Sequence, residues 1–254
     1  MRPAAGKTRR AAAVAALLLA AAACRPRRGT GVDGYAFVAA AGSSALAVVD
    51  LATFSVARQI PLAARPAQVV SDARRKLVYV MGEGGPAGLT VVDARKLEVR
   101  QRLWLAEEPQ RIRLSGDGRE LYILDAGARL FKIFDLEKMA HGRQIRLDGS
   151  PVDFAISPDA RWACISLRSG AAAVVDLARW RVSGEAQVGG DPEAVAIRHD
   201  SRQAFVSNRS ERLVSVIDLP SGRLVAQLPL NARPEALRFK PDGGELFVSG
   251  GDSS

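Results

Sequence analysis

The stretch that decides the fold is residues 192–233, PEAVAIRHDSRQAFVSNRSERLVSVIDLPSGRLVAQLPLNAR. It contains four short apolar runs, at residues 194–197, 203–207, 213–219 and 224–230, which are separated by turn-forming residues. Asp, Ser, Asn, Pro and Gly favour tight reversals through local hydrogen bonds or unusual backbone angles. The stretch therefore predicts four antiparallel strands that follow one another as a meander.

This pattern recurs along the chain with a period of 41 to 43 residues. A full repeat has a proline that opens a run Pro-x-x-apolar-x-apolar, an aromatic residue or cysteine inside a strand, and an aspartate that ends a strand; the first repeat has no such proline. The three rows are Pro66, Pro109, Pro151, Pro192 and Pro234; Phe37, Tyr79, Tyr122, Cys164, Phe205 and Phe247; and Asp50, Asp93, Asp135, Asp176 and Asp218. A repeat of this length made of short strands is typical of a propeller blade. We therefore predict an all-β fold, a β-propeller of four-stranded antiparallel blades, with the aromatic row at equivalent buried positions.

Two segments resemble a known family. Residues 151–160, PVDFAISPDA, resemble the Pro-x-x-Val-Ala-Ser-Pro-Asp-Gly start of the YVTN-type β-propeller repeats of exported bacterial and archaeal proteins, and Phe205-Val206-Ser207-Asn208 stands where that family has Tyr-Val-Thr-Asn. The resemblance spans roughly residues 35–250 and implies that the strand opened by the proline is the innermost of its blade. Family members commonly have seven blades. The repeats here supply 21 strands, about five and a half blades, which predicts a fragment of a seven-bladed ring and leaves ring closure open.

The first residues differ from the repeats. Residues 1–10 are basic without acids, residues 11–23 contain only Ala, Val and Leu, and Cys24 follows directly. This order predicts a secretory signal peptide at 1–23, because so short an apolar stretch cannot span a bilayer as a helix. The segment also resembles a bacterial lipobox, which implies a lipid on Cys24, an anchor and tether at 24–34 and a propeller at 35–254. Lipidation at Cys24 and plain cleavage to a soluble periplasmic protein both stay open.

The net charge of +9 lies mainly in this leader. Seven of the 36 basic residues fall within residues 1–28, and the other 29 nearly balance the 27 acidic residues, so the repeats give no reason to expect nucleic-acid binding. Cys164 takes the aromatic position of its repeat, which predicts a small buried hydrophobe rather than a reactive thiol. His141 and His199 lie in expected turns without metal-ligand spacing, and the sequence has no Cys-x-x-Cys-His motif. We expect no metal and no other cofactor.

Binding residues should break the repeat, because residues that recur in every blade share a structural duty. Propellers commonly bind at the rim of the central channel, where loops differ from blade to blade. The predicted rim site consists of Arg65, Arg168, Glu193, Asn208, Arg209 and Arg233. Arg168 and Arg209 lie in equivalent loops of adjacent blades, and two converging arginines would hold a carboxylate or phosphate. The sequence therefore predicts an acidic ligand or partner.

Two functional hypotheses follow. The first is an exported, membrane-anchored binding or protein-interaction scaffold in the bacterial envelope, a periplasmic or outer-membrane lipoprotein whose partner is an unidentified envelope protein or acidic ligand. The second is an enzyme, either a lactonase-like or an oxidoreductase-linked, cofactor-binding propeller that uses the channel mouth. The sequence holds no recognisable nucleophile and base pair, so we predict no catalytic residue and favour the scaffold.

Overall fold

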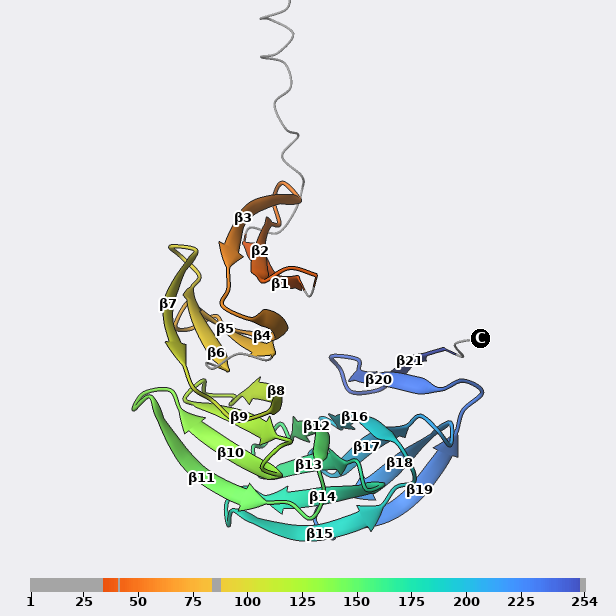
Figure 1. Cartoon of the computed structure of the whole chain (residues 1–254). Helices are drawn as coiled ribbons and strands as arrows, with labels where there is room; N and C mark the ends of the chain where they lie inside the picture. The colour runs from red at the N-terminus through yellow and green to blue at the C-terminus, as the bar shows by residue number, and fades with distance from the viewer. Residues whose placement is uncertain (1–33, 41, 84–87, 252–254) are drawn as a thin grey trace, which may run out of the picture. The chain divides into compact units, whose positions relative to one another are not determined.

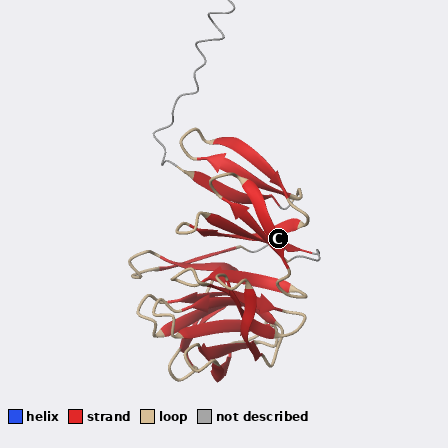
Figure 2. Cartoon of the chain, turned by 90° about the vertical axis from the view of Figure 1, so that its left-hand side faces the viewer, coloured by secondary structure: helices blue, strands red, loops and turns tan. Residues whose placement is uncertain are grey.

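The computed structural model describes residues 34–40, 42–83 and 88–251. Every regular element in these residues is a β-strand (Figures 1 and 2), and none is a helix long and apolar enough to cross a membrane. The 21 strands form six sheets in chain order, and four of these sheets have four antiparallel strands. The all-β class and the strand count predicted from the sequence are confirmed. The predicted signal peptide and Cys24 lie outside the described residues.

The chain divides into two compact units, which are described separately. One comprises residues up to Val38 with Ala47–Gln59, and the other comprises Ala39–Leu46 with Ile60–Ser254. The first sheet has the order β1-β2-β3, formed by β1 (Tyr35–Ala40), β2 (Ala45–Asp50) and β3 (Ser55–Pro61). The first unit therefore contains most of a three-stranded sheet.

The second unit contains the four-stranded sheets, called blades below. The first two blades consist of β4 (Arg65–Asp72), β5 (Leu77–Glu83), β6 (Leu89–Asp93) and β7 (Glu98–Leu103), and of β8 (Pro109–Leu114), β9 (Glu120–Asp125), β10 (Leu130–Asp135) and β11 (Ala140–Arg146). The next two consist of β12 (Pro151–Ile156), β13 (Trp162–Leu167), β14 (Ala171–Asp176) and β15 (Arg181–Gln187), and of β16 (Pro192–Ile197), β17 (Gln203–Asn208), β18 (Leu213–Asp218) and β19 (Arg223–Pro229). A two-stranded sheet follows, with β20 (Pro234–Phe239) and β21 (Leu246–Gly250). The ends of β16 to β19 agree with the sequence prediction to within two residues.

The recurring aspartates close the turn between the third and fourth strands of a sheet. The Asp93 carboxylate accepts hydrogen bonds from the backbone N–H groups of Arg95 (2.9 Å) and Lys96 (2.9 Å). The Asp135 carboxylate likewise accepts hydrogen bonds from two backbone N–H groups of its turn, and the Asp218 carboxylate accepts one from the Ser221 backbone N–H. These backbone hydrogen bonds lower the pKa of Asp93 and Asp135, because they favour the charged form. The predicted scaffold role of this row is therefore confirmed.

The apolar cores lie between neighbouring blades. Ala163 and Ile165 of β13 pack in one cluster with Phe131 of the preceding blade, whereas Cys164 packs in another cluster with Val195 of the following blade. Successive residues of a strand point to opposite faces, so β13 is apolar throughout because both faces are covered. Every residue of β13 and β14 is buried. Blade-on-blade packing is thus the main source of apolar burial in the second unit.

The aromatic row is buried only where a neighbouring sheet covers it. Tyr79, Tyr122 and Cys164 are 1%, 6% and 0% exposed, and Phe37 and Phe205 are half-buried. The complete burial of Cys164 in a core cluster confirms its packing role, and the same burial raises the pKa of the thiol to about 12. Phe247 is 57% exposed, so the prediction of a buried Phe247 was wrong. Its sheet has two strands, and no further described sheet packs on its outer face.

Candidate functional site

Three of the predicted rim residues are exposed arginines without an ion pair in the described part of the chain. Arg65 begins β4 and pairs in register with Glu83, Arg168 follows β13, and Arg233 precedes β20. The structure therefore leaves these three side chains open to solvent, each at a different blade.

Asn208 is unsuited to the binding role predicted for it, because its side chain is completely buried. Its Nδ2 donates a hydrogen bond to the Val188 carbonyl (2.9 Å), and its Oδ1 accepts from the Glu211 backbone N–H (3.2 Å). The amide thus bonds to backbone groups of two loops and holds these loops together. The Asn208 side chain differs from the residues at this position in the other repeats, but its role is to stabilise the fold.

Arg168 and Arg209 occupy equivalent loops, as predicted, but no common partner joins their side chains. Their backbone N–H groups make matching hydrogen bonds, to the carbonyls of Ser150 (2.8 Å) and Asp191 (3.1 Å). The Arg209 guanidinium instead lies 3.4 Å from the Glu235 carboxylate of β20. The predicted pair of converging arginines is absent from the described contacts, since Arg209 already has a carboxylate partner.

The sixth predicted residue, Glu193, lines a polar cavity of about 360 Å³ between the first strands of the blades. These inner strands are β4, β8, β12, β16 and β20, which neighbour one another in that order (Figure 1). We call this space the inner cavity. Its charged lining residues are Arg111, Arg113, Asp153, Glu193, Glu235 and Arg238. Its size is within the range of small-molecule sites.

Asp153 is the electrostatic centre of the inner cavity. One carboxylate oxygen lies 3.3 Å from Arg113 Nη2 and 3.6 Å from Arg111 Nε, and the other accepts a hydrogen bond from the Val195 backbone N–H (3.1 Å). Arg113 Nε also donates to the Phe154 carbonyl (2.5 Å). Charge-assisted hydrogen bonds of this kind are stronger than neutral ones. Asp153 therefore joins three neighbouring inner strands, β8, β12 and β16.

Gln68 makes a comparable link between the first two inner strands. Its side-chain amide donates to the Ile112 carbonyl (2.9 Å) and accepts from the Ile112 backbone N–H (2.9 Å). Gln68, Arg111 and Asp153 all stand two residues after the proline of their repeat. This position faces the inner cavity and carries a different polar side chain in each of these blades.

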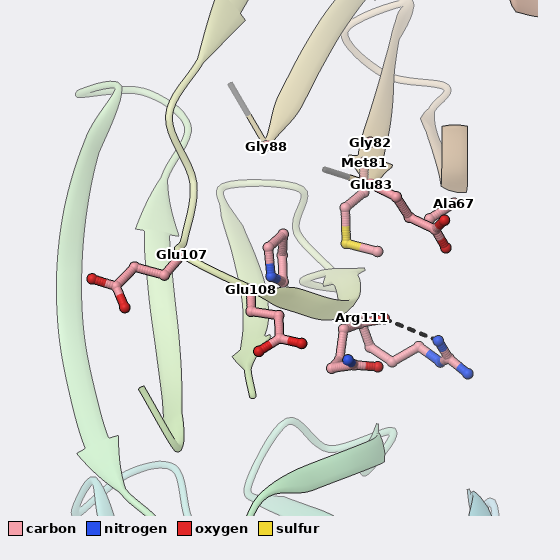
Figure 3. Close-up of a pocket in the computed structure, with 10 residues that line it drawn as sticks. Ala67, Met81, Gly82, Glu83, Gly88, Glu107, Glu108 and Arg111 are labelled. Carbon is pink, nitrogen blue, oxygen red and sulfur yellow. Dashed lines mark hydrogen bonds between the residues drawn. The ribbon is translucent and has the colours of Figure 1, made fainter. Parts of the chain in front are cut away.

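A second cavity, of about 500 Å³, lies beside the first, between the start of β4, the end of β5 and the start of β8 (Figure 3). We call it the rim cavity. Three glutamates line it, Glu83, Glu107 and Glu108, together with Arg111, which lines both cavities. Arg111 Nη1 donates to the Gln110 carbonyl (2.9 Å), which is the dashed line in Figure 3. Arg111 therefore connects an acidic space with the mixed charge of the inner cavity.

The second blade contains a buried ion pair, which has no counterpart among the described residues of the other blades. Lys132 Nζ lies 2.6 Å from Asp125 Oδ2, with side-chain exposures of 8% and 1%, and the ammonium group sits 5.6 Å from the centre of the Trp104 ring. Burial opposes ionisation of Asp125, but the hydrogen bonds from Lys132 and from backbone N–H groups outweigh burial and lower the pKa of Asp125.

His141 lies in edge-on contact with the rings of Trp104 and Phe134 and belongs to β11 rather than to the predicted turn. Burial, with a smaller effect of Lys132, lowers the pKa of His141.

The described residues contain no group of three or more His, Cys, Asp or Glu side chains arranged to hold a metal ion. The free thiol of Cys164 is fully buried. The charged groups that line the inner cavity are guanidinium and carboxylate groups, which recognise opposite charge on a ligand.

Comparison with known proteins supports the fold. No protein-family model matches the chain, and no curated protein matches it. Dihydro-heme d1 dehydrogenase NirN, solved in complex with DHE, is 19% identical with a TM-score of 0.71, covering 85% of this chain and 50% of its own. This chain thus spans about half the length of NirN.

Two further solved structures are similar. A functionally unknown protein from Desulfotomaculum acetoxidans has a TM-score of 0.74 at 15% identity, covering 86% of this chain and 73% of its own. Kuenenia stuttgartiensis hydrazine synthase has a TM-score of 0.56 at 15% identity, covering 87% and 93%. NirN and hydrazine synthase are β-propeller proteins. The fold of this chain is a β-propeller. At these identities the likeness extends to the fold alone.

Proposed function

We propose that the chain is an exported, membrane-anchored β-propeller of the YVTN type that acts as a binding or protein-interaction scaffold in the bacterial envelope. The observation that carries the proposal is the inner cavity, where charged side chains from β8, β12, β16 and β20 meet. These side chains depart from the repeat, because the residues two and four positions after Pro192 are alanines, whereas Arg111 and Arg113 hold those positions after Pro109. Positions whose residues are not required for packing within the repeat can carry residues that bind a ligand.

Export and anchoring rest on the leader sequence. The basic start, the apolar stretch and the small residues before Cys24 favour a lipid-modified cysteine at the mature N-terminus. Arg25, Arg27 and Arg28 follow at once, and basic residues at an anionic membrane surface each add about 1 kcal/mol of attraction. A propeller held in this way would present its cavity to envelope components.

The test is capture of partners from native envelope extracts with the full-length protein. Wild type is compared with the double variant Arg111→Ala/Arg238→Ala in the inner cavity and with Arg223→Ala on the outer strand β19, an exposed arginine that serves as control. We expect wild type and the control to retain the same envelope component and the cavity variant to lose it. Equal retention by all three proteins would place the interface elsewhere.

The enzymatic hypothesis predicts a different result in the same material. A lactonase-like or cofactor-dependent propeller would show turnover, or would carry a coloured group through purification, and either property would disappear in the Arg111→Ala/Arg238→Ala variant. NirN was solved in complex with DHE, and that fact concerns NirN; similarity at 19% identity does not favour the same ligand here.

A further inference from the structure

The inner cavity carries charges of opposite sign at different levels. Counted from the proline that opens each inner strand, Glu193 is the first residue, Arg111 the second and Arg238 the fourth. A strand rises about 3.3 Å per residue, so the levels of Glu193 and Arg238 differ by about 10 Å along the strand direction. Their strands, β16 and β20, are neighbours. One cavity therefore offers a carboxylate at one level and a guanidinium group at another.

The other two carboxylates of the cavity already have partners within the protein. Asp153 is only 12% exposed at its side chain and is held by Arg113 and Arg111, while Glu235 lies beside Arg209. Two arginines share the single carboxylate of Asp153, and the Arg111 side chain is 45% exposed. The Asp153 side of the cavity thus keeps an excess of positive charge.

Glu193 and Arg238 have no such partner. In the described part of the chain neither takes part in an ion pair, with each other or with another residue. Both nevertheless line the same cavity of about 360 Å³. A ligand that enters this space removes water from both groups, and desolvated charges without partners are costly. A ligand that fits must therefore supply one charge of each sign.

We infer that the inner cavity binds a small zwitterion, with its carboxylate at Arg238 and its ammonium group at Glu193. Arg111 provides a second guanidinium group in the same cavity. A dianion would bring a second negative charge against Glu193, and a dication would bring a positive charge against Arg238, so both are discriminated against by repulsion. This inference rests on the proposed binding role of the inner cavity and adds the chemical class of the ligand.

Three probes with the same five-carbon skeleton test the inference: 5-aminopentanoate (zwitterion), glutarate (dianion) and cadaverine (dication). Each is titrated into the full-length protein by isothermal calorimetry at low ionic strength. We expect 5-aminopentanoate to bind about fivefold or more tighter than either of the others, the scale of one partly exposed charge contact. A result in which glutarate or cadaverine binds wild type most tightly overturns the inference, and so does the absence of binding by all three.

Charge-removing variants assign the two ends. Glu193→Gln should lose the preference for 5-aminopentanoate over glutarate, and Arg238→Gln should lose the preference over cadaverine. Glu185→Gln and Arg223→Gln make the same charge changes on the outer strands β15 and β19 and should leave the order of the probes unchanged. An order that does not respond to Glu193→Gln or Arg238→Gln refutes the assignment.

The two proposals fail in different ways. If envelope capture depends on the cavity but none of the three probes binds, the scaffold function stands and the zwitterion inference is wrong. If 5-aminopentanoate binds as expected but no envelope component depends on the cavity, the ligand class stands and the scaffold function is wrong.

Discussion

Replacement of Phe131 by alanine should be among the most destabilising single changes in the second unit. Phe131 is completely buried on β10, and its ring lies 5.4 Å from the rings of Phe154 and Trp180 in the next blade and 5.8 Å from Tyr122 in its own. Truncating a buried phenylalanine costs about 3 to 5 kcal/mol, and aromatic pairs add about 0.5 to 1.5 kcal/mol each. Because Phe131 has three aromatic partners, Phe131→Ala should lower the free energy of unfolding by about 4 to 5 kcal/mol, near the upper end of that range.

Phe205 offers a matched comparison within the same molecule. It is half-buried on β17 and has one aromatic neighbour, Phe239, at 5.2 Å. Because less area is removed from water, Phe205→Ala should cost roughly 2 kcal/mol. The two variants remove the same side chain and differ in how far a neighbouring sheet covers the ring and in the number of aromatic contacts.

Urea unfolding measures the free-energy cost of both changes. The transition is followed by far-ultraviolet circular dichroism and by tryptophan fluorescence, and Trp180 beside Phe131 contributes to the fluorescence. Coinciding transitions and unchanged denaturant slopes are needed for the free energies to be compared. A cost for Phe131→Ala below that for Phe205→Ala would refute the conclusion that blade-on-blade packing dominates stability.

Three other outcomes are expected. Burial raises the pKa of Tyr122 to about 12, so the folded state resists its ionisation; stability should fall as pH rises above about 10 and through 12, and Tyr122→Phe should reduce this alkaline loss in pH-dependent melting curves. Asp153→Ala should cost about 2 kcal/mol in urea unfolding, because it leaves Arg113 and the Val195 N–H without their acceptor; Asp153→Asn, which keeps an acceptor, should cost less. Cys24→Ser should release the protein from the membrane fraction, and wild type without a lipid mass in intact-protein mass spectrometry would contradict the anchor.

The fold was predictable because packing and turn chemistry repeat. The five aspartates and the five prolines recur at one period and have the same role in each repeat, so that weak local signals reinforce one another. Phe247 shows the limit of this reasoning. Its position in the repeat predicts burial, but burial requires a covering sheet, and its exposure of 57% reflects the neighbour rather than the residue.

The candidate site was harder to predict. A residue that differs from its equivalents in the other repeats can have either a structural role or a binding role, and the sequence alone does not distinguish the two. Asn208 breaks the repeat and is a buried hydrogen-bonding group, while Arg209 breaks it and is held by Glu235. The signal that would have identified the inner cavity lies in the strand opened by Pro109. There Arg111 and Arg113 occupy alternate positions that are alanines after Pro192, and alternate residues share one face of a strand.

Each inner strand contributes the residue two positions after its proline to the inner cavity, and each blade closes its own hairpins. The repeat is therefore a unit of exchange as well as a unit of folding. Duplicating or swapping one segment of about 42 residues would replace one sector of the cavity wall and keep the turn aspartates and blade contacts on which the scaffold depends. Recognition in such a molecule can diversify sector by sector, and a library of exchanged repeats would sample new combinations of charge without redesign of the core.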